Sequence, residues 1–153
     1  MLAVYLSTGL RFKAVLEMGD DLDRVSGEFA VVEKGGKHRP VRMSPRALKL
    51  TKRYLTVRPG TGSGRLWVTA LGAPLTYWGG QSVFRRVRRR SGVTRLHAHL
   101  CRHTFGQVAL AKGAERAAVQ DMLGHETDAM TRRYTREARE QTAAAMMPRY
   151  AAV

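Results

Sequence analysis

Hydrophobic residues recur at helical spacing along most of the chain. In the first 20 residues, Leu10, Ala14, Val15 and Met18 form one apolar stripe, and Gly9 is expected to end a helical turn that precedes it. The same spacing predicts further helices over residues 45–57, 77–90, 98–112, 114–123 and 127–135, followed by an Ala-rich segment at 136–147. The chain is therefore expected to be mostly helical.

Two short segments are instead rich in strand formers. Residues 27–33 (GEFAVVE) and 38–43 (HRPVRM) predict strands, and the KGG sequence at 34–36 predicts the turn that joins them into a hairpin. Residues 66–68 (LWV) predict a short strand or extended segment. Together with the helices, the hairpin predicts an α+β fold that is mostly α-helical, with a small antiparallel sheet.

Local signals mark where several of these helices begin and end. Ser44 followed by Pro45 is typical of a helix N-terminus, and Thr76 is expected to cap the next helix. Gly113 and Gly124 are expected to end two later helices. The helix that ends at Gly113 is predicted to bury an apolar side formed by Leu100, Cys101, Phe105, Val108 and Ala109.

Length and composition restrict the classes of protein. The 153 residues fit one domain, and a hydrophobic fraction of 44% suffices for a core. A single cysteine excludes a disulfide framework and a multi-Cys zinc site. No apolar run approaches the ~18–20 residues that span a bilayer, and the first basic residues follow the apolar N-terminus, which is the wrong order for a signal peptide. A soluble, cytoplasmic protein without membrane contact is expected.

The distribution of charge points to a polyanionic partner. The chain holds 27 Lys and Arg against 12 Asp and Glu, a net charge of +15. Residues 34–114 contain 18 basic side chains and no acidic one, whereas residues 1–33 are net negative and residues 115–153 are neutral. Because such a stretch cannot neutralise itself by internal ion pairs, nucleic acid is the favoured partner. A merely basic soluble protein is the alternative.

Four short motifs hold residues suited to one reaction. They are TGLR, EKGGKHRPV, HLCRHTF and LGHETDAMTRRYT, and the residues concerned are, in order, Arg11, Lys34, His99, Arg102, His125 and Tyr134. Lys34 follows the first arginine by 23 residues, and Tyr134 follows the second histidine by 9. In its order and spacings this set resembles the catalytic domain of the tyrosine recombinases, the phage integrase family. The resemblance covers nearly the whole chain.

The resemblance implies a fold, a reaction and a set of partners. The expected fold is the DNA breaking-rejoining catalytic core, and the expected function is site-specific DNA recombination or integration through a 3′-phosphotyrosine. Double-stranded DNA is the implied partner, bound as a tetramer in full-length members, and no small-molecule substrate, ATP, metal or other cofactor is implied. Such a protein would be bacterial or phage-encoded and associated with the nucleoid.

The chemistry of the side chains supports the same roles independently. Arg11 and Arg102 can each bind phosphate oxygens bidentately while staying charged, and His99 precedes the second arginine by three residues on a predicted helix. Tyr134 supplies an oxygen nucleophile, activated by a base such as His99 or by the surrounding cations. Lys34, at the predicted hairpin turn, is suited to protonate the leaving 5′-oxygen as general acid.

A second set of basic residues is predicted to bind DNA. It comprises the arginines of FRRVRRR and two residues beside the hairpin turn: Arg85, Arg86, Arg88, Arg89, Arg90, Lys37 and Arg39. Most are expected to contact phosphates, and one or two arginines are expected to read guanine edges, because in recombinases of the Cre type the equivalent helix enters the major groove.

The alternating segment LHAHLCRH raises the alternative of a metal site. On a strand, the three histidines and the cysteine would share one face, but on a helix they scatter. The apolar residues around them follow helical spacing, so no metal site is predicted.

Three departures from the family pattern qualify the assignment. The first arginine lies almost at the start, so residues 1–153 are interpreted as a single catalytic domain that is truncated at its N-terminus and lacks the N-terminal core-binding domain. Ala14 stands where the family commonly has an acidic residue, and Glu33 stands where a glycine usually precedes the lysine. Two alternatives stay open: a resolving recombinase of the Xer type, and a non-catalytic DNA-binding remnant.

Overall fold

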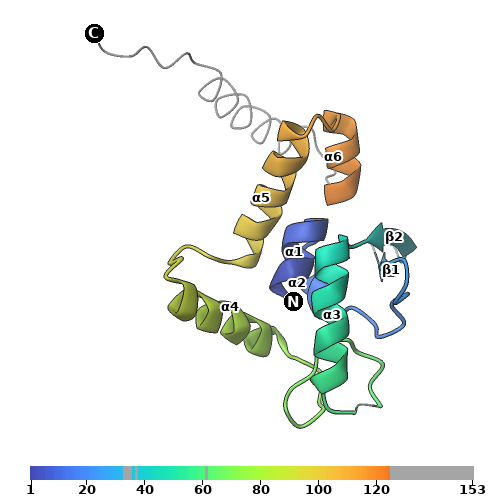
Figure 1. Cartoon of the computed structure of the whole chain (residues 1–153), viewed down its shortest axis with the longest axis vertical. Helices are drawn as coiled ribbons and strands as arrows, with labels where there is room; N and C mark the ends of the chain where they lie inside the picture. The colour runs from blue at the N-terminus through green and yellow to red at the C-terminus, as the bar shows by residue number, and fades with distance from the viewer. Residues whose placement is uncertain (33–35, 37, 61, 125–153) are drawn as a thin grey trace.

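The computed structural model describes residues 1–32, 36, 38–60 and 62–124. Within them the chain forms, in order, α1 (Leu2–Thr8), α2 (Phe12–Leu16), β1 (Glu28–Val32), β2 (His38–Arg42), α3 (Pro45–Val57), α4 (Tyr77–Ser91), α5 (Ala98–Ala111) and α6 (Arg116–Leu123). Helices α5 and α6 lie together at one end of the molecule, and α3 and α4 lie toward the other (Figure 1). The predicted class, mostly helical with a small antiparallel sheet, is confirmed.

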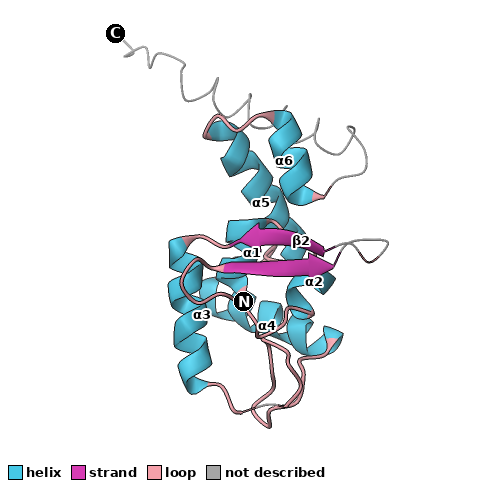
Figure 2. Ribbon diagram, turned by 90° about the vertical axis from the view of Figure 1, so that its right-hand side faces the viewer, coloured by secondary structure: helices cyan, strands magenta, loops and turns pink. Residues whose placement is uncertain are grey.

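The two strands form an antiparallel hairpin, shown in magenta in Figure 2. Its register pairs Glu28 with Arg42 at the open end and Val32 with His38 next to the turn. Alternate side chains of β1 are buried because a strand turns successive residues to opposite faces, and the inner face carries Phe29. The residues of the turn itself, 33–35 and 37, lie outside the described part of the chain.

The main core surrounds α1, which packs against both α3 and α5. Val4 and Tyr5 are fully buried there, and the Tyr5 ring lies near those of Phe12 and Phe84, with centroids 6.2 and 5.2 Å away. The Tyr5 hydroxyl donates a hydrogen bond to the Phe12 carbonyl at 3.2 Å, and burial raises the pKa of this phenol. One aromatic cluster thus joins α1, α2 and α4.

The predicted signals at helix ends are confirmed. Ser44 Oγ accepts a hydrogen bond from the Ala47 amide, and Thr76 Oγ1 accepts one from the Gly79 amide. Gly9 ends α1 and Gly124 ends α6, both in the left-handed conformation that favours glycine. These signals act within one helical turn, which explains why the sequence alone reveals them.

Two expectations about local structure are wrong. The apolar stripe of the first 20 residues is helical only over Phe12–Leu16. Val108 is 46% exposed, since among the described residues this part of α5 packs against the small second core of Val119 and Leu123. Residues 66–68, where a short strand or an extended segment was expected, form no strand, and their pairing is an isolated bridge between Val68 and Pro74. Through the described residues, no helix has both the length and the apolarity to cross a membrane.

Candidate active site

Arg102 is a buried cation held by main-chain oxygens. Its side chain lies on α5 and the residue is only 5% exposed. Nη1 donates a hydrogen bond to the Gly9 carbonyl at 2.7 Å, and Nη2 donates one to the Leu123 carbonyl at 2.6 Å. A guanidinium is stabilised at the carbonyl end of a helix, and these acceptors belong to the ends of α1 and α6. The side chain is therefore fixed before any ligand binds.

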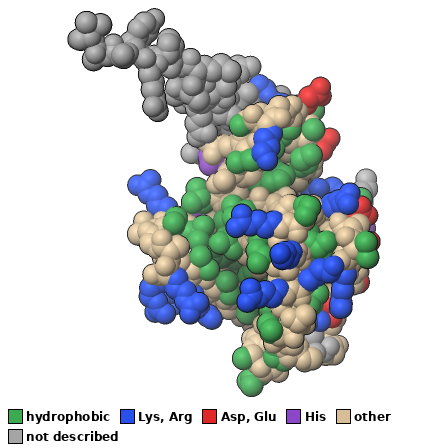
Figure 3. All heavy atoms as spheres, viewed as in Figure 1, with side chains coloured by type: hydrophobic (Ala, Val, Ile, Leu, Met, Phe, Trp, Pro, Cys, Tyr) green, Lys and Arg blue, Asp and Glu red, His purple; other side chains and the backbone are tan. Residues whose placement is uncertain are grey.

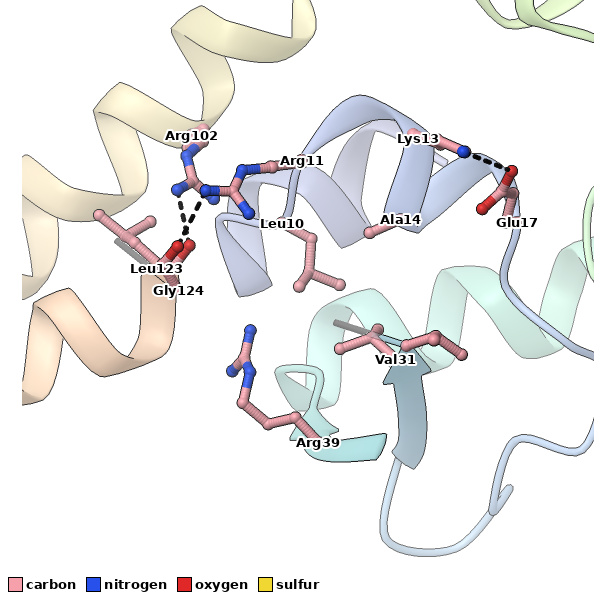
Figure 4. A pocket seen from close by; sticks show the side chains of 11 residues that line it. Leu10, Arg11, Lys13, Ala14, Glu17, Val31, Arg39, Arg102, Leu123 and Gly124 are labelled. Atoms are coloured by element: carbon pink, nitrogen blue, oxygen red, sulfur yellow. Dashed lines mark hydrogen bonds and ion pairs between the residues drawn. The ribbon is translucent and has the colours of Figure 1, made fainter. Parts of the chain in front are cut away.

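Arg11 reaches the same place from the start of α2. It is the N-cap residue of that helix, it is exposed, and its Nη2 donates to the Gly124 carbonyl at 2.9 Å. The two arginines, 91 positions apart in sequence, thus bind the adjacent carbonyls of Leu123 and Gly124. Figure 4 shows both guanidinium groups meeting at this end of α6.

Gly9 makes this junction sterically possible. Its φ is +63°, and a Cβ at this position would lie 2.7 Å from Cδ2 of Leu123 and would also clash with the Phe105 ring. The residue therefore satisfies two conditions that only glycine meets, a left-handed backbone and a close approach of α1 to α5 and α6. From the sequence, Gly9 was predicted only to end a helix. The available signal for its place at the site was that it lies two residues before Arg11.

A pocket of about 350 Å³ opens beside the two arginines. Its described walls are formed by Leu10, Arg11, Lys13, Ala14, Glu17, Val31, Val32, Arg39, Arg102, Leu123 and Gly124. Arg39 projects from β2 toward the two other guanidinium groups across the pocket (Figure 4). Glu17 is the acidic residue among these lining residues, and its carboxylate lies 3.8 Å from the Lys13 amine. The pocket is thus strongly basic, as an anionic ligand requires.

The remaining predicted catalytic residues are distributed differently. His99 is exposed in the first turn of α5, its ring is stacked on that of His97, and it is not among the pocket-lining residues. Lys34, Lys37, His125 and Tyr134 lie outside the described residues. Two of them adjoin the pocket in sequence, because Lys34 is two residues beyond Val32 and His125 directly follows Gly124.

The segment LHAHLCRH, which raised the alternative of a metal site, leads into and forms the first turns of helix α5. His97 is the N-cap of α5, and His99, Cys101 and His103 lie within this helix, as the helical spacing predicted. Burial raises the pKa of the Cys101 thiol to about 11, so this residue stays a neutral thiol at physiological pH. Across the described ranges, no three His, Cys, Asp or Glu side chains are grouped so as to hold a metal ion.

The predicted DNA-binding arginines of α4 form a separate surface. Helix α4 packs on α2 through Gly80 and Phe84, and a Cβ at Gly80 would lie 2.8 Å from Cζ of Phe12. The opposite side carries the exposed arginines Arg85, Arg86, Arg89 and Arg90, whereas Arg88 is half-buried. Figure 3 shows Lys and Arg side chains gathered at the lower left, where α4 lies.

Comparison with known proteins places this arrangement in a family. The model of the phage integrase family matches residues 1–141. The chain belongs to the phage integrase family. Among proteins similar to it, the tyrosine recombinase XerC of Staphylococcus saprophyticus is 35% identical over 146 residues, which are 92% of this chain and 49% of that protein. XerC of Haemophilus ducreyi is 34% identical, over 88% of this chain and 46% of that protein.

Solved structures of integrase-family proteins share the fold. The crystal structure of the XerA recombinase superposes with a TM-score of 0.82 at 26% identity, covering 97% of this chain and 57% of that one. The XerH site-specific recombinase bound to its palindromic difH substrate gives a TM-score of 0.74 at 25% identity, covering 95% of this chain and 44% of that one. This integrase-family chain spans about half the length of the relatives it matches.

Proposed function

We propose that this chain is the catalytic domain of a site-specific tyrosine recombinase, which cleaves and rejoins double-stranded DNA through a 3′-phosphotyrosine. One observation carries the proposal. Arg11 and Arg102 converge on the carbonyls of Leu123 and Gly124, immediately before His125 in the chain. Two of the six expected catalytic residues thus meet at one end of α6, and a third, His125, comes next in the sequence.

The two arginines would stabilise the transition state. During phosphoryl transfer in DNA, negative charge builds up on the non-bridging oxygens, and a guanidinium presents N–H donors in a planar fork that matches them. Arg102 is fixed by two carbonyls and Arg11 by one, so neither needs to reorganise when the charge develops. Arg39 adds a third positive charge on the opposite wall of the pocket.

Tyr134 and Lys34 would carry the bond-making and bond-breaking steps. The Tyr134 oxygen attacks the scissile phosphorus, its proton passes to a base such as His99, and the bond to the 5′-oxygen breaks. Lys34 donates a proton to that leaving oxygen. Val31 and Val32 line the pocket just before the hairpin turn, which supports delivery of the lysine from this side. His125 would contribute a further donor to the phosphate.

The chemistry of this scheme needs no external energy source. The phosphotyrosine link retains the energy of the broken phosphodiester bond, so rejoining by the 5′-hydroxyl uses neither ATP nor a metal ion. We assign DNA contacts to the α4 arginines and to Lys37 and Arg39, and assembly on DNA as a tetramer to full-length members of the family. The similarity to XerC proteins favours a resolving recombinase of the Xer type as the subclass.

A suicide substrate tests the proposal. The DNA carries a nick beside the scissile phosphate, so that cleavage releases a short fragment and traps the covalent complex. The chain should form a covalent adduct that resists denaturing electrophoresis, and Tyr134→Phe should form none while keeping its DNA affinity. DNA binding without any adduct from the unaltered chain would instead identify a non-catalytic DNA-binding remnant. An undiminished adduct in the variant would remove Tyr134 as the nucleophile.

A further inference from the structure

Helix α4 presents one solvent-facing row that begins with an aromatic residue. Trp78, Ser82, Arg85 and Arg89 follow one another at spacings of four, three and four residues, which places them on one face of the helix. Trp78 is 74% exposed, and both arginines are exposed. At ~1.5 Å per residue, the row extends over roughly 16 Å.

The buried side of α4 fixes this row outward. Gly80 and Phe84 are buried, and Gly80 approaches the Phe12 ring so closely that no larger residue fits without rearrangement. Rotation of α4 about its axis would break this contact. Because Phe12 directly follows Arg11, the same contact ties the orientation of the row to the position of the proposed catalytic arginine.

Trp78 is exposed, although a neighbouring aromatic ring packs against its indole. The Tyr77 ring packs edge-on against it, with centroids 5.4 Å apart and planes at 88°. Tyr77 in turn packs edge-on against Phe12 at 5.1 Å. The other tryptophan of the chain, Trp67, is 4% exposed in the core, which is the usual fate of such a large apolar ring. A supported but exposed indole indicates a surface that a ligand covers.

Charge identifies the chemistry of that ligand. Residues 34–114, which contain all of α4, have 18 basic side chains and no acidic one. An apolar ring in line with two arginines at such a surface fits the edges of base pairs between two phosphate backbones. The major groove of B-DNA is ~12 Å wide and admits an α-helix, and its apolar feature is the C5-methyl group of thymine.

We propose that Trp78, in line with Arg85 and Arg89, contacts thymine methyl groups in the major groove that this helix is expected to enter, and so contributes to the choice of DNA sequence. The inference rests on the proposed function, because DNA has to be the ligand. It deepens that function by assigning an apolar residue, Trp78, to recognition of the DNA sequence, which the arginine-rich motif did not indicate. If the ligand of this surface were an acidic protein and not DNA, the Trp78 ring would stay accessible when DNA is bound.

The first test measures access to the Trp78 ring. Acrylamide, an uncharged quencher, is titrated into the free chain and into the chain saturated with duplex DNA, with saturation followed by fluorescence anisotropy of the labelled DNA. Trp78→Phe supplies the signal of buried Trp67, which is subtracted. Bound DNA should reduce the quenching of Trp78 several-fold and leave that of Trp67 unchanged. Unchanged quenching of Trp78 in the DNA complex would overturn the inference.

The second test asks whether thymine methyl groups are the contact. Alternating A·T duplexes are compared with duplexes of the same sequence in which uracil replaces every thymine, which removes only the methyl group. The unaltered chain should bind the thymine duplex about fourfold more tightly for each methyl group buried, the factor that corresponds to one buried CH₂-sized group. Trp78→Ala should abolish this preference, whereas Val57→Ala, at a 76% exposed apolar residue on α3, should preserve it.

The outcomes separate this inference from the proposed function. Failure to bind any duplex would refute both. DNA binding with a covalent adduct, but with an accessible Trp78 or with equal affinity for thymine and uracil duplexes, would refute the role of Trp78 alone. Circular dichroism of Trp78→Ala controls for folding, and Trp78→Phe, which keeps an apolar ring, should retain part of the thymine preference.

Discussion

Arginines occupy two regions of this molecule under opposite conditions. At the junction of α1, α5 and α6, Arg102 is 5% exposed and is bound by two main-chain carbonyls at 2.6 and 2.7 Å. On the outer side of α4, Arg85 and Arg89 are exposed to solvent. The first arrangement suits a group that must be in place when charge develops, and the second suits charges that adapt to a long polyanion. Arginine thus provides a fixed donor geometry in one region and, under the proposed function, affinity for DNA in the other.

The largest effect is expected at the buried arginine. Arg102→Ala should lower the rate of covalent adduct formation by ~10²-fold or more, the scale for removing one preorganised donor to a transition-state oxyanion. It should also lower the free energy of unfolding by ~1–3 kcal/mol for each carbonyl left without a donor. Adduct yield on a suicide substrate and urea unfolding measure the two effects.

Arg11→Ala provides the matched variant. It should reduce adduct formation on the same scale but lower stability far less, because Arg11 is exposed and, within the described part of the chain, donates one hydrogen bond, to Gly124. Equal losses of stability in both variants would contradict the distinction between a buried and an exposed member of the pair.

Gly9→Ala should cost stability and activity together. The added Cβ meets Leu123 and Phe105 and forces a left-handed backbone on alanine, at a cost of ~1–3 kcal/mol. Since the Gly9 carbonyl holds Arg102, the adduct rate should fall as well. Gly60→Ala is the control, because a Cβ there meets no atom within 4 Å and its φ is not in the left-handed region. Thermal unfolding and adduct kinetics of the two variants test this, and a neutral Gly9→Ala would remove the steric argument.

Changes on α4 should affect binding without affecting stability. Replacing Arg85 and Arg89 by Gln should weaken DNA binding and flatten the dependence of log K on log salt by up to ~0.9 for each phosphate that the variant no longer neutralises. The melting temperature should stay within about a degree, since these side chains are exposed. Anisotropy titrations at several salt concentrations measure the slope, with the exposed Arg24→Gln, outside the acid-free segment, as control. An unchanged slope would exclude this face from the DNA complex.

The smallest effect is expected from removal of metal ions. If Arg11, Arg102 and their neighbours supply all the positive charge at the phosphate, adduct formation should be unchanged in excess EDTA. Activity that disappears under EDTA and returns with a divalent cation would mean that the arginines are insufficient by themselves.

The sequence predicted best what is decided locally. The caps at Ser44 and Thr76 and the left-handed ends at Gly9 and Gly124 depend on neighbours within one turn, and residue types alone indicate them. The exposure of Val108 was not foreseeable from spacing, because helical periodicity identifies an apolar side but not how much of it a neighbouring helix covers.

For the candidate site, too, the sequence indicated individual residues but not the tertiary contacts that bring them together. The motifs selected Arg11 and Arg102, but the acceptors that bring them together are carbonyls of Gly9, Leu123 and Gly124, and a main-chain oxygen has no signature in a sequence. Arg39 was assigned to DNA contact from its charge alone. Its place in the pocket wall depends on the position of β2, which follows from tertiary packing.

The hydrogen bond from Arg11 to the Gly124 carbonyl joins residues 113 positions apart, so the junction has a consequence for biosynthesis. A growing chain displays TGLR early, but the oxygen that orients its arginine is added more than a hundred residues later. Because ribosomes add ~5–20 residues per second, the wait lasts several seconds or more. A chain that stops before Gly124 therefore lacks the contact that orients Arg11. Under the proposed function, such a chain would not yet be competent to cleave DNA, so completion of the polypeptide would itself guard against premature cleavage.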